Sequence, residues 1–371
     1  MPRDKIVGGE GSSSEDDRPV DDRPVDDGPV DEQPVDDRAS SDDDRDLRPQ
    51  SMDEMVGQRT VYERLSIAID AAQKRGDALG HILFDGPPGL GKTTFSLCIA
   101  RDMGVPIQIT TGPALKAPHN LIPYLTNAER KSVLFIDEIH RMPAAVEEYL
   151  YTAMEDFRID LVLGEGVNAR THNLHLKPFT LIGATTRAGM LTAPLRDRFQ
   201  VREHLGFYDY AELQEIVTRS AAKLEIRIDA ESAIEIARRS RGTPRIANNH
   251  LRWIRDYAQS RADGFIDMNV TNSALKMSGV DEKGLTNLDR KYVETLIRVF
   301  GGGPAGIEAI AHTMNTSSDT MEDEVEPFLL RIEFLVRTPR GRIVTAKGYQ
   351  HLGVDSPTAS KGEDDSQQSL F

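Results

Sequence analysis

The residues best suited to chemistry begin with a glycine-rich stretch, Gly86-Pro87-Pro88-Gly89-Leu90-Gly91-Lys92-Thr93. It matches G-x-x-x-x-G-K-[ST], follows the apolar run HILFD and opens a helical pattern. Glycines let backbone N–H groups curl around phosphate oxygens, and the next helix N-terminus adds positive charge. We expect Lys92 at the β- and γ-phosphates and the Thr93 hydroxyl at Mg²⁺. The alternative, a chance glycine-rich turn, does not explain the order strand, motif, helix.

Two carboxylates follow a second apolar run, LFI at 134–136. The run predicts a strand that delivers Asp137 and Glu138 to its C-terminal end, where ligands bind in parallel sheets. Asp137 would hold Mg²⁺, directly or through water, and Glu138 would polarise an attacking water. Such acids can also be solvated loop residues, but here a phosphate motif precedes them. The pair favours ATP hydrolysis, and no NKxD-type guanine-reading motif is present.

The elements that must position these residues can be read from periodicity. Apolar runs at 81–86, 106–111, 132–139 and 179–186 predict buried parallel strands, separated by helical patterns such as 93–103. Residues 209–279 show helical periodicity only, with helices expected over 210–224, 230–240 and 244–262. Residues 282–352 predict a helix over 288–300, a turn at 301–304, two short helical stretches and a strand–turn–strand over 328–348. The fold class is α/β: a parallel-sheet core, a small helical domain and a C-terminal winged helix.

Charge and composition set the domain limits. The chain has 371 residues and a net charge of −15, and residues 1–50 hold 17 acidic against 7 basic side chains. The five-residue acidic repeat at 16–40 predicts disorder over 1–46, and 354–371 has a similar composition. Between them we expect a large domain (47–208), a small helical domain (209–280) and a head (281–353). Because the acids lie in the tails, the overall charge does not argue against nucleic acid.

Two classes of protein are excluded by simple counts. Cys98 is the only cysteine, so no intramolecular disulfide can form, and a reducing compartment is expected. No apolar run approaches the ~20 residues that span a bilayer, and the acidic N-terminus is no secretory signal. We therefore expect a cytoplasmic protein with no membrane partner.

A basic cluster lies near the C-terminus, with Arg337, Arg340, Arg342 and Lys347 on or beside the expected hairpin. Arginines on a wing suit phosphate contacts along a DNA duplex, which are independent of sequence and sensitive to salt. An ordinary solvated turn is the alternative from charge alone.

Four further motifs make a resemblance specific: GATTR at 183–187, PLRDRF at 194–199, RGTPR at 241–245 and Glu155-Asp156-Phe157. With the motifs above the chain resembles the AAA+ ATPases and, within them, the RuvB family of motors that drive Holliday-junction branch migration. GPPGLGKTT, LFIDEIHR, AMEDFR, LIGATTRAG, RRSRGTPRIAN, FGGGP and RTPRGR all fit that family. The resemblance runs from about Leu47 to Gly353. Gln200 stands where the family pattern has Gly, and Asn249-His250 replaces a more basic stretch.

The resemblance implies a role for each matching residue. Thr185 or Thr186 would be sensor 1, near the attacking water, and Arg245 would be sensor 2, contacting the nucleotide of its own chain. Arg198 would be an arginine finger supplied to the neighbouring subunit, so that hydrolysis requires a ring, typically a hexamer. The remaining nucleotide-binding residues implied are Leu47, Arg48, Gly89, Gly91, Thr94, Glu155, Asp156, Phe157 and Tyr208, in addition to Lys92 and Thr93.

The resemblance also implies partners. Residues 159–177 resemble the family's β-hairpin that docks on RuvA, the junction-binding protein, and Gly164 and Gly166 suit its turn. His172 and His175 in this hairpin lack metal-ligand spacing and are interpreted as surface residues. The expected function is an ATP- and Mg²⁺-dependent motor in recombination, repair and the SOS response, with duplex DNA, a RuvA-like protein and a RuvC-like resolvase as partners. The alternative is a clamp-loader-like AAA+ ATPase acting on DNA. A polypeptide unfoldase is disfavoured because GPALKAPHNLI, after the second strand, has no aromatic pore residue.

Overall fold

Five parallel strands form the centre of the large domain in the computed structural model, which describes residues 46–163 and 170–355. The sheet order is β2-β3-β6-β1-β7, and every neighbouring pair is parallel. The strands are β1 (Ile82–Asp85), β2 (Ile107–Thr111), β3 (Val133–Asp137), β6 (Thr180–Thr185) and β7 (Val201–His204). The first four confirm the predicted strands, but β2 is not buried as predicted, because it lies at the sheet edge and only Thr110 in it is buried. β7 was not predicted, because VREH is short, polar and at the sheet edge.

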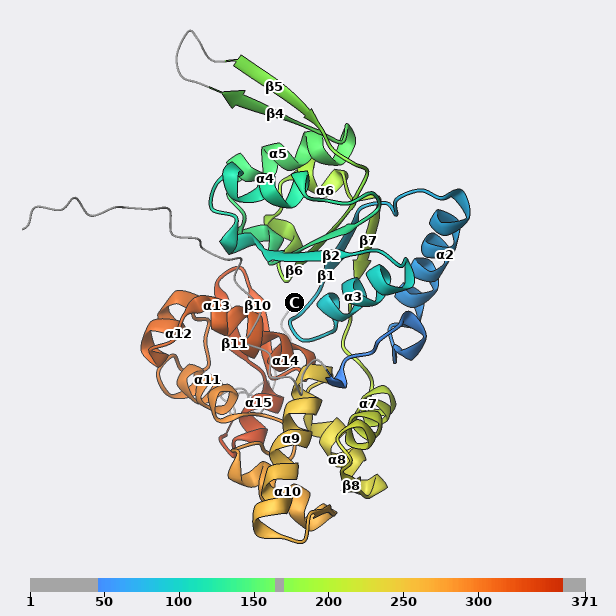
Figure 1. Ribbon diagram of the computed structural model, residues 1–371. Helices are drawn as coiled ribbons and strands as arrows, with labels where there is room; N and C mark the ends of the chain where they lie inside the picture. The colour runs from blue at the N-terminus through green and yellow to red at the C-terminus, as the bar shows by residue number, and fades with distance from the viewer. Residues whose placement is uncertain (1–45, 164–169, 356–371) are drawn as a thin grey trace, which may run out of the picture.

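Helices cover both faces of this sheet (Figure 1). Ile82, Phe84 and Phe135 pack on one face into a core that includes α2 and α3, whereas Leu83 and Leu134 pack on the other with α4 and α5. The alternation follows from the two-residue period of a strand. The helices of this domain are α2 (Arg59–Arg75), α3 (Lys92–Asp102), α4 (Pro118–Thr126), α5 (Ala144–Glu155) and α6 (Ala193–Asp197), with short 3₁₀ turns η1 (Met52–Glu54), η2 (Gly112–Ala114), η3 (Ile139–Arg141) and η5 (Ala188–Met190).

A hairpin projects from the large domain beyond α5 (Figure 1). Its antiparallel strands are β4 (Arg158–Leu163) and β5 (Arg170–His175). This confirms a hairpin in the predicted region, and His172 and His175 are exposed, as expected. The predicted turn at Gly164 and Gly166 lies outside the described residues.

The helical domain, here called the lid, holds α7 (Tyr210–Lys223), α8 (Ala230–Arg239), α9 (Pro244–Arg261) and α10 (Met268–Met277). Asp209, Asp229 and Asp267 cap three of these helices by accepting a hydrogen bond from a backbone N–H three residues on. The three predicted helices are confirmed. A two-residue parallel pair was not predicted, β8 (Arg227–Ile228) with β9 (Phe265–Ile266).

The head confirms a winged-helix arrangement but corrects one segment. Its elements are α11 (Asn287–Arg298), α12 (Ile307–Met314), α13 (Ser318–Thr320), the π-helical η6 (Met321–Val325), α14 (Glu326–Arg331), β10 (Leu335–Thr338), β11 (Gly341–Val344) and α15 (Ala346–His351). The strand–turn–strand predicted over 328–348 is too long, since 328–331 belong to α14 and 346–348 to α15. Met321, Val325, Phe328 and Leu329 are buried at helical spacing, so the apolar run continues a helix.

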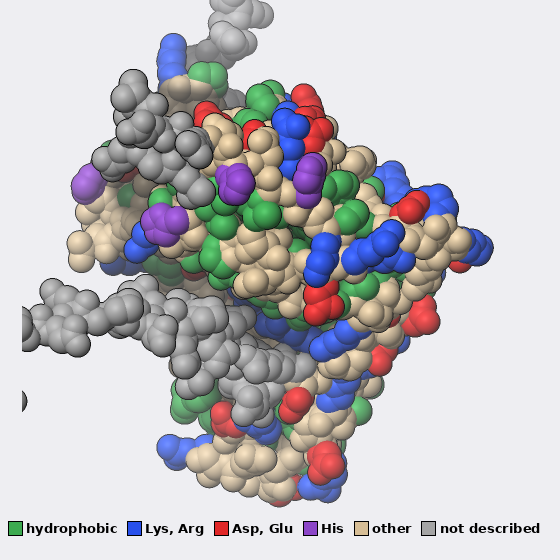
Figure 2. Space-filling model, turned by 45° about the horizontal axis from the view of Figure 1, so that its top comes forward, with side chains coloured by type: hydrophobic (Ala, Val, Ile, Leu, Met, Phe, Trp, Pro, Cys, Tyr) green, Lys and Arg blue, Asp and Glu red, His purple; other side chains and the backbone are tan. Residues whose placement is uncertain are grey.

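The segments predicted to be disordered, 1–46 and 354–371, lie almost wholly outside the described residues. Within the described part of the chain, none of the helices is both long enough and apolar enough to cross a membrane. On the face seen in Figure 2, Lys and Arg side chains are interspersed with Asp and Glu.

Candidate nucleotide-binding site

A cavity of about 1060 Å³ lies between the large domain and the lid. Its volume is that of a site for a sizeable small molecule. Most of the predicted nucleotide-site residues line it: Leu47, Arg48, Gly89, Gly91, Lys92, Thr93, Thr94, Asp137, Glu138, Thr186, Tyr208 and Arg245. Residues from six separate stretches of sequence thus meet in one place.

The phosphate loop owes its shape to glycine. Gly89 and Gly91 have φ of 77° and 101°, which L-residues with a side chain rarely adopt. A Cβ on Gly89 would also lie 2.7 Å from Thr243 Cγ2 of the lid. The loop therefore needs glycine both for its turn and for the close approach of the lid.

Lys92 is buried at the first position of α3, with a relative exposure of 8%. Its Nζ donates hydrogen bonds to the carbonyl oxygens of Gly86 (2.7 Å) and Pro87 (2.9 Å). Burial lowers the pKa of Lys92 to about 8, and the nearby carboxylate of Asp137 opposes that shift. The ammonium is thus held in the loop, where an added anion would stabilise its charge.

The carboxylate pair ends β3 as expected. Asp137 Oδ1 accepts a hydrogen bond from Glu138 N (2.9 Å), and burial raises the pKa of Asp137. Glu138 has the left-handed backbone conformation (φ 48°, ψ 40°) and forms an ion pair with Arg141 at 3.0 Å. Both carboxylates line the cavity, Asp137 from the last position of β3 and Glu138 from the turn that follows it.

The end of β6 distinguishes the two sensor candidates. Thr186 lines the cavity. Thr185 is fully buried; its Oγ1 accepts from Arg187 N (2.9 Å) and lies 3.0 Å from His140 Nδ1. The geometry favours Thr186 as the group that faces the nucleotide and gives Thr185 a role in joining β6 to the turn after Glu138.

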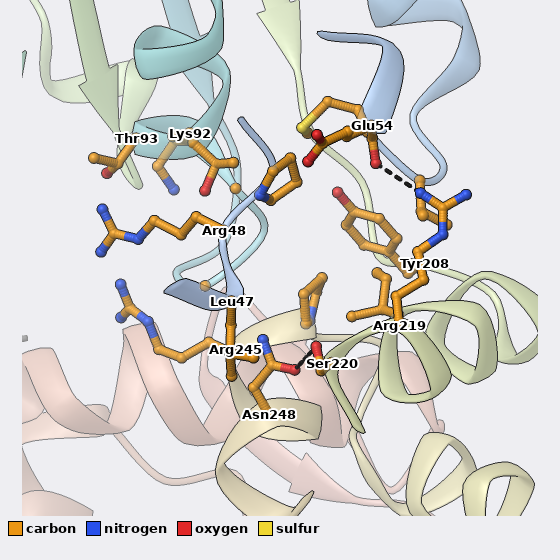
Figure 3. Close-up of a pocket in the computed structure, with 18 of the residues that line it drawn as sticks. Leu47, Arg48, Glu54, Lys92, Thr93, Tyr208, Arg219, Ser220, Arg245 and Asn248 are labelled. Carbon is orange, nitrogen blue, oxygen red and sulfur yellow. Dashed lines mark hydrogen bonds between the residues drawn. The ribbon is translucent and has the colours of Figure 1, made fainter. Parts of the chain in front are cut away.

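The other walls come from the N-terminal segment and the lid. Figure 3 shows Arg48 and Arg245 extending to the side of the cavity where Lys92 and Thr93 lie. Tyr208 lies at the opposite side, where its hydroxyl donates to Leu90 O (3.3 Å). Three cationic side chains therefore converge on the phosphate end of the cavity.

Some lining residues were missed by the sequence analysis. Ile216, Arg219, Ser220 and Lys223 lie on one face of α7 and line the cavity. Ser220 Oγ donates to Asn248 Oδ1 of α9 (2.8 Å), and Arg219 Nη1 donates to Glu54 O (2.9 Å). Their i, i+3, i+4, i+7 spacing was the available signal, but it does not indicate which face meets another domain.

Arg198 and Glu155 do not line this cavity. They border a separate hollow of about 470 Å³, together with Phe157 and Gln200. Arg198 donates to Pro194 O (2.7 Å) and Glu155 Oε2 (3.1 Å), and its guanidinium lies 4.5 Å from the ring centre of Tyr151. Asp156, which lines neither cavity, forms an ion pair with Arg158 at 3.7 Å.

The residues that depart from the family pattern, Gln200 and His250, are both held by the surrounding structure. Gln200 Oε1 accepts from His81 N (2.5 Å) and so ties the start of β1 to the segment before β7. Burial lowers the pKa of His250 to about 4, so this side chain is neutral at pH 7. Burial therefore keeps His250 uncharged, which agrees with the lower positive charge expected at residues 249–250.

The three wing arginines differ in their surroundings. Arg340 lies exposed in the turn between β10 and β11. Arg337 and Arg342 both pair with Glu326, which is fully buried, and Arg342 also donates to Glu322 (2.9 Å). Tyr292 donates its hydroxyl to the same Glu326 (2.6 Å). Beside the wing, Lys347 pairs with Glu333.

Comparison with known proteins gives the same partition of the chain. Residues 47–205 match the model of the Holliday junction DNA helicase RuvB P-loop domain, 208–281 the RuvB AAA lid domain, and 282–353 the RuvB C-terminal winged helix domain. A Holliday junction branch migration complex subunit RuvB of Rhodopirellula baltica is 67% identical over 316 residues, 85% of this chain and 86% of the relative.

Solved structures agree with these matches. The RuvB Holliday junction branch migration motor of Thermotoga maritima is 44% identical, with a TM-score of 0.77 over 84% of this chain and all of that one. A point mutant of the same motor gives a TM-score of 0.79 at 44% identity, over 84% of this chain and 99% of that one. The chain therefore belongs to the RuvB family of AAA+ ATPases, the motors of Holliday-junction branch migration.

Proposed function

We propose that this member of the RuvB family is a ring-forming motor that hydrolyses ATP between subunits and moves duplex DNA at Holliday junctions. The observation that supports it most is the meeting of Lys92, Glu138, Thr186 and Arg245 around one cavity between the large domain and the lid. Loss of the γ-phosphate would change what both domains contact, and so turn the lid relative to the sheet.

The residues of the cavity fit Mg²⁺-ATP. Thr93 and Asp137 offer a hydroxyl and a carboxylate oxygen, the hard ligands that Mg²⁺ takes alongside phosphates and water. Bound there, Mg²⁺ would neutralise charge on the β- and γ-phosphates. Lys92, Arg48 and Arg245 would hold the triphosphate, Glu138 would orient and deprotonate the attacking water, and Leu47 and Tyr208 would flank the base.

Arg198 supports an assembly larger than one chain. It is 21% exposed and lies away from the cavity of its own subunit, beside Glu155. We propose that Arg198, with Glu155, Asp156 and Phe157, faces the nucleotide of the neighbouring subunit in a hexameric ring. The guanidinium would then stabilise charge that develops on the γ-phosphoryl group, worth about 10³–10⁵ in rate.

The head and the hairpin would supply the other contacts. We propose that Arg340, at the exposed turn, contacts duplex phosphates, and that Arg337 and Arg342 present the N–H groups that Glu326 leaves free. The hairpin β4–β5 would dock on a RuvA-like junction-binding protein, and a RuvC-like resolvase would act on the same junction. We propose that the chain does this work, in recombination and repair, in the cytoplasm.

The decisive experiment is an ATPase assay with a four-way junction plus a RuvA-like protein, against a primer–template plus a sliding clamp. We expect stimulation by the junction mixture and none by the clamp mixture. Lys92→Ala should abolish turnover in both, which assigns the activity to this cavity. Stimulation by the clamp mixture alone, or normal turnover by Lys92→Ala, would contradict the proposal.

A further inference from the structure

Arg187 links the nucleotide cavity to the head. It directly follows Thr186 at the end of β6, and its side chain crosses to the acidic segment of the head, residues 318–324. Nε donates to Asp323 Oδ1 (3.0 Å), and Nη2 lies 2.8 Å from Asp319 Oδ1 and 3.7 Å from Glu322 Oε2. In Figure 1 the end of the head that carries α13 faces the large domain. One side chain therefore joins two domains next to the proposed sensor 1.

The contacts continue from the acidic segment to the wing. Glu322 Oε1 accepts from Arg342 Nη2 (2.9 Å), and Arg342 Nε donates to Glu326 Oε1 (2.8 Å). Glu326 is fully buried, whereas the Glu322 side chain is 34% exposed. Glu322 is thus the more exposed carboxylate of the two, and it lies between the guanidinium groups of Arg342 and Arg187.

Arg187 Nη2 makes a short but poorly aligned contact. It is buried and lies 2.8 Å from Asp319 Oδ1, close enough for Asp319 to help raise the pKa of Arg187, but this contact is not a well-directed hydrogen bond. The second N–H of Nη2 can therefore donate to a further carboxylate without breaking the bond from Nε to Asp323.

The backbone of Arg187 reaches the catalytic side as well. Its N–H donates to Thr185 Oγ1, which also contacts His140 in η3, two residues after Glu138. A displacement of Arg187 would therefore act on Thr186 through the chain and on the turn of Glu138 through Thr185.

From these contacts we infer that Arg187 is a positioning residue, which couples DNA contact at the wing to the geometry of the ATP site in the same subunit. The inference rests on the proposed roles of the cavity and the wing. A duplex phosphate that binds Arg342 competes with Glu322. Glu322 then turns to Nη2 of Arg187 and shifts the end of β6. Partly exposed ion pairs add little to stability, so a purely structural role explains this cluster less well.

The test uses the full chain and removes charge on the head side, from two carboxylates that do not line the nucleotide cavity. The variant D319N/D323N is compared with the parent for kcat and KM of ATP, with and without duplex DNA. We expect basal kcat and KM within about twofold of the parent, and stimulation by DNA reduced about fivefold or more, the usual size of coupling between sites. Glu333→Gln is the matched control, because it breaks an ion pair of the head that lies outside this path.

A charge exchange completes the test. Arg187→Asp should lose stimulation, and adding Asp323→Arg should recover part of it. Unchanged stimulation in D319N/D323N, no recovery in the exchange, or equal loss of basal and stimulated turnover with a lower unfolding temperature would overturn the coupling. A parent that duplex DNA does not stimulate would instead contradict the proposed function, and the coupling with it.

Discussion

At the scale of single residues, the ammonium of Lys92 is already buried in the cavity before any ligand is bound. The ammonium of Lys92 is buried against two carbonyl oxygens of the loop that would bind phosphate. Its lowered pKa means that the free protein holds this charge at a cost. A triphosphate would relieve that cost, so binding energy is concentrated at the phosphates.

This predicts a pH dependence of ATP binding. The pKa of Lys92 is about 8 in the free protein, and the negative charge of a bound triphosphate must raise it. Above pH 8 binding therefore takes up a proton, and ATP affinity should fall by up to about tenfold per pH unit toward pH 9.5. Calorimetric titration at constant Mg²⁺ measures this.

The matched control for that measurement is Lys92→Arg. Guanidinium keeps its charge throughout this range, so its affinity should vary much less with pH. All other titrating groups are shared by the two proteins. Equal slopes in the parent and in Lys92→Arg would exclude Lys92 as the group responsible.

A second prediction separates Thr185 from Thr186. Thr186→Val should lower turnover and leave thermal stability unchanged, because Thr186 lines the cavity. Thr185→Val should lower the free energy of unfolding by about 1–3 kcal/mol, because it leaves the buried N–H of Arg187 without its acceptor. Paired ATPase and urea-unfolding measurements decide the assignment, and the reverse pattern would make Thr185 the sensor.

At the scale of elements, the wing is built around a buried carboxylate. Glu326 sits at the start of α14 and receives Arg337, Arg342 and the hydroxyl of Tyr292. Burying a carboxylate is tolerated only when it is paired in this way. The wing's basic residues therefore have two tasks: Arg337 and Arg342 satisfy Glu326 and keep further N–H groups for a ligand, whereas Arg340 extends into solvent at the turn.

The two tasks predict different effects of substitution, one on duplex binding and one on stability. Arg340→Ala should weaken duplex binding and reduce the slope of log K against log salt by about one, with unchanged stability. Arg342→Ala should lower stability by about 1.5–3 kcal/mol, the value of a hydrogen bond to a charged group. Fluorescence anisotropy over a salt series and thermal unfolding measure the two effects. If Arg340→Ala binds duplex with the parent's salt slope, the turn makes no phosphate contact.

The elements also show which parts of the fold could be predicted from the sequence alone. Strands buried on both faces and capped helices were predictable, because their patterns are local. The helix at 328–331 was not, because the short apolar run Phe328-Leu329-Leu330 fits a strand or a helix until its packing partners are known. The pairing of Arg342 with Glu326, 16 residues apart, and of Arg187 with Asp323 depends on tertiary contacts that no spacing reveals.

At the scale of the whole molecule, the proposed function requires more than one chain. The cavity gathers Lys92, the carboxylates of Asp137 and Glu138, and Arg245, whereas Arg198 lies outside it. Glu155 and Tyr151 hold Arg198 in place on the surface of the large domain. This position fits the proposal that Arg198 acts on a nucleotide bound by a neighbouring subunit.

Mixing two inactive variants tests this last point. Arg198→Ala should bind ATP normally and lose about 10³–10⁵ in turnover, because the charge on the γ-phosphoryl group is no longer neutralised. Glu138→Gln should also be inactive, because it cannot deprotonate water. In a mixed ring, a Glu138→Gln subunit next to an Arg198→Ala subunit can lend its intact Arg198 to its neighbour's intact Glu138. Turnover should therefore reappear in the mixture, with a maximum at intermediate ratios.

A double variant, which carries both changes in one chain, is the control that must stay inactive when mixed with either single variant. A mixture as inactive as its components would mean that Arg198 does not act across the subunit boundary.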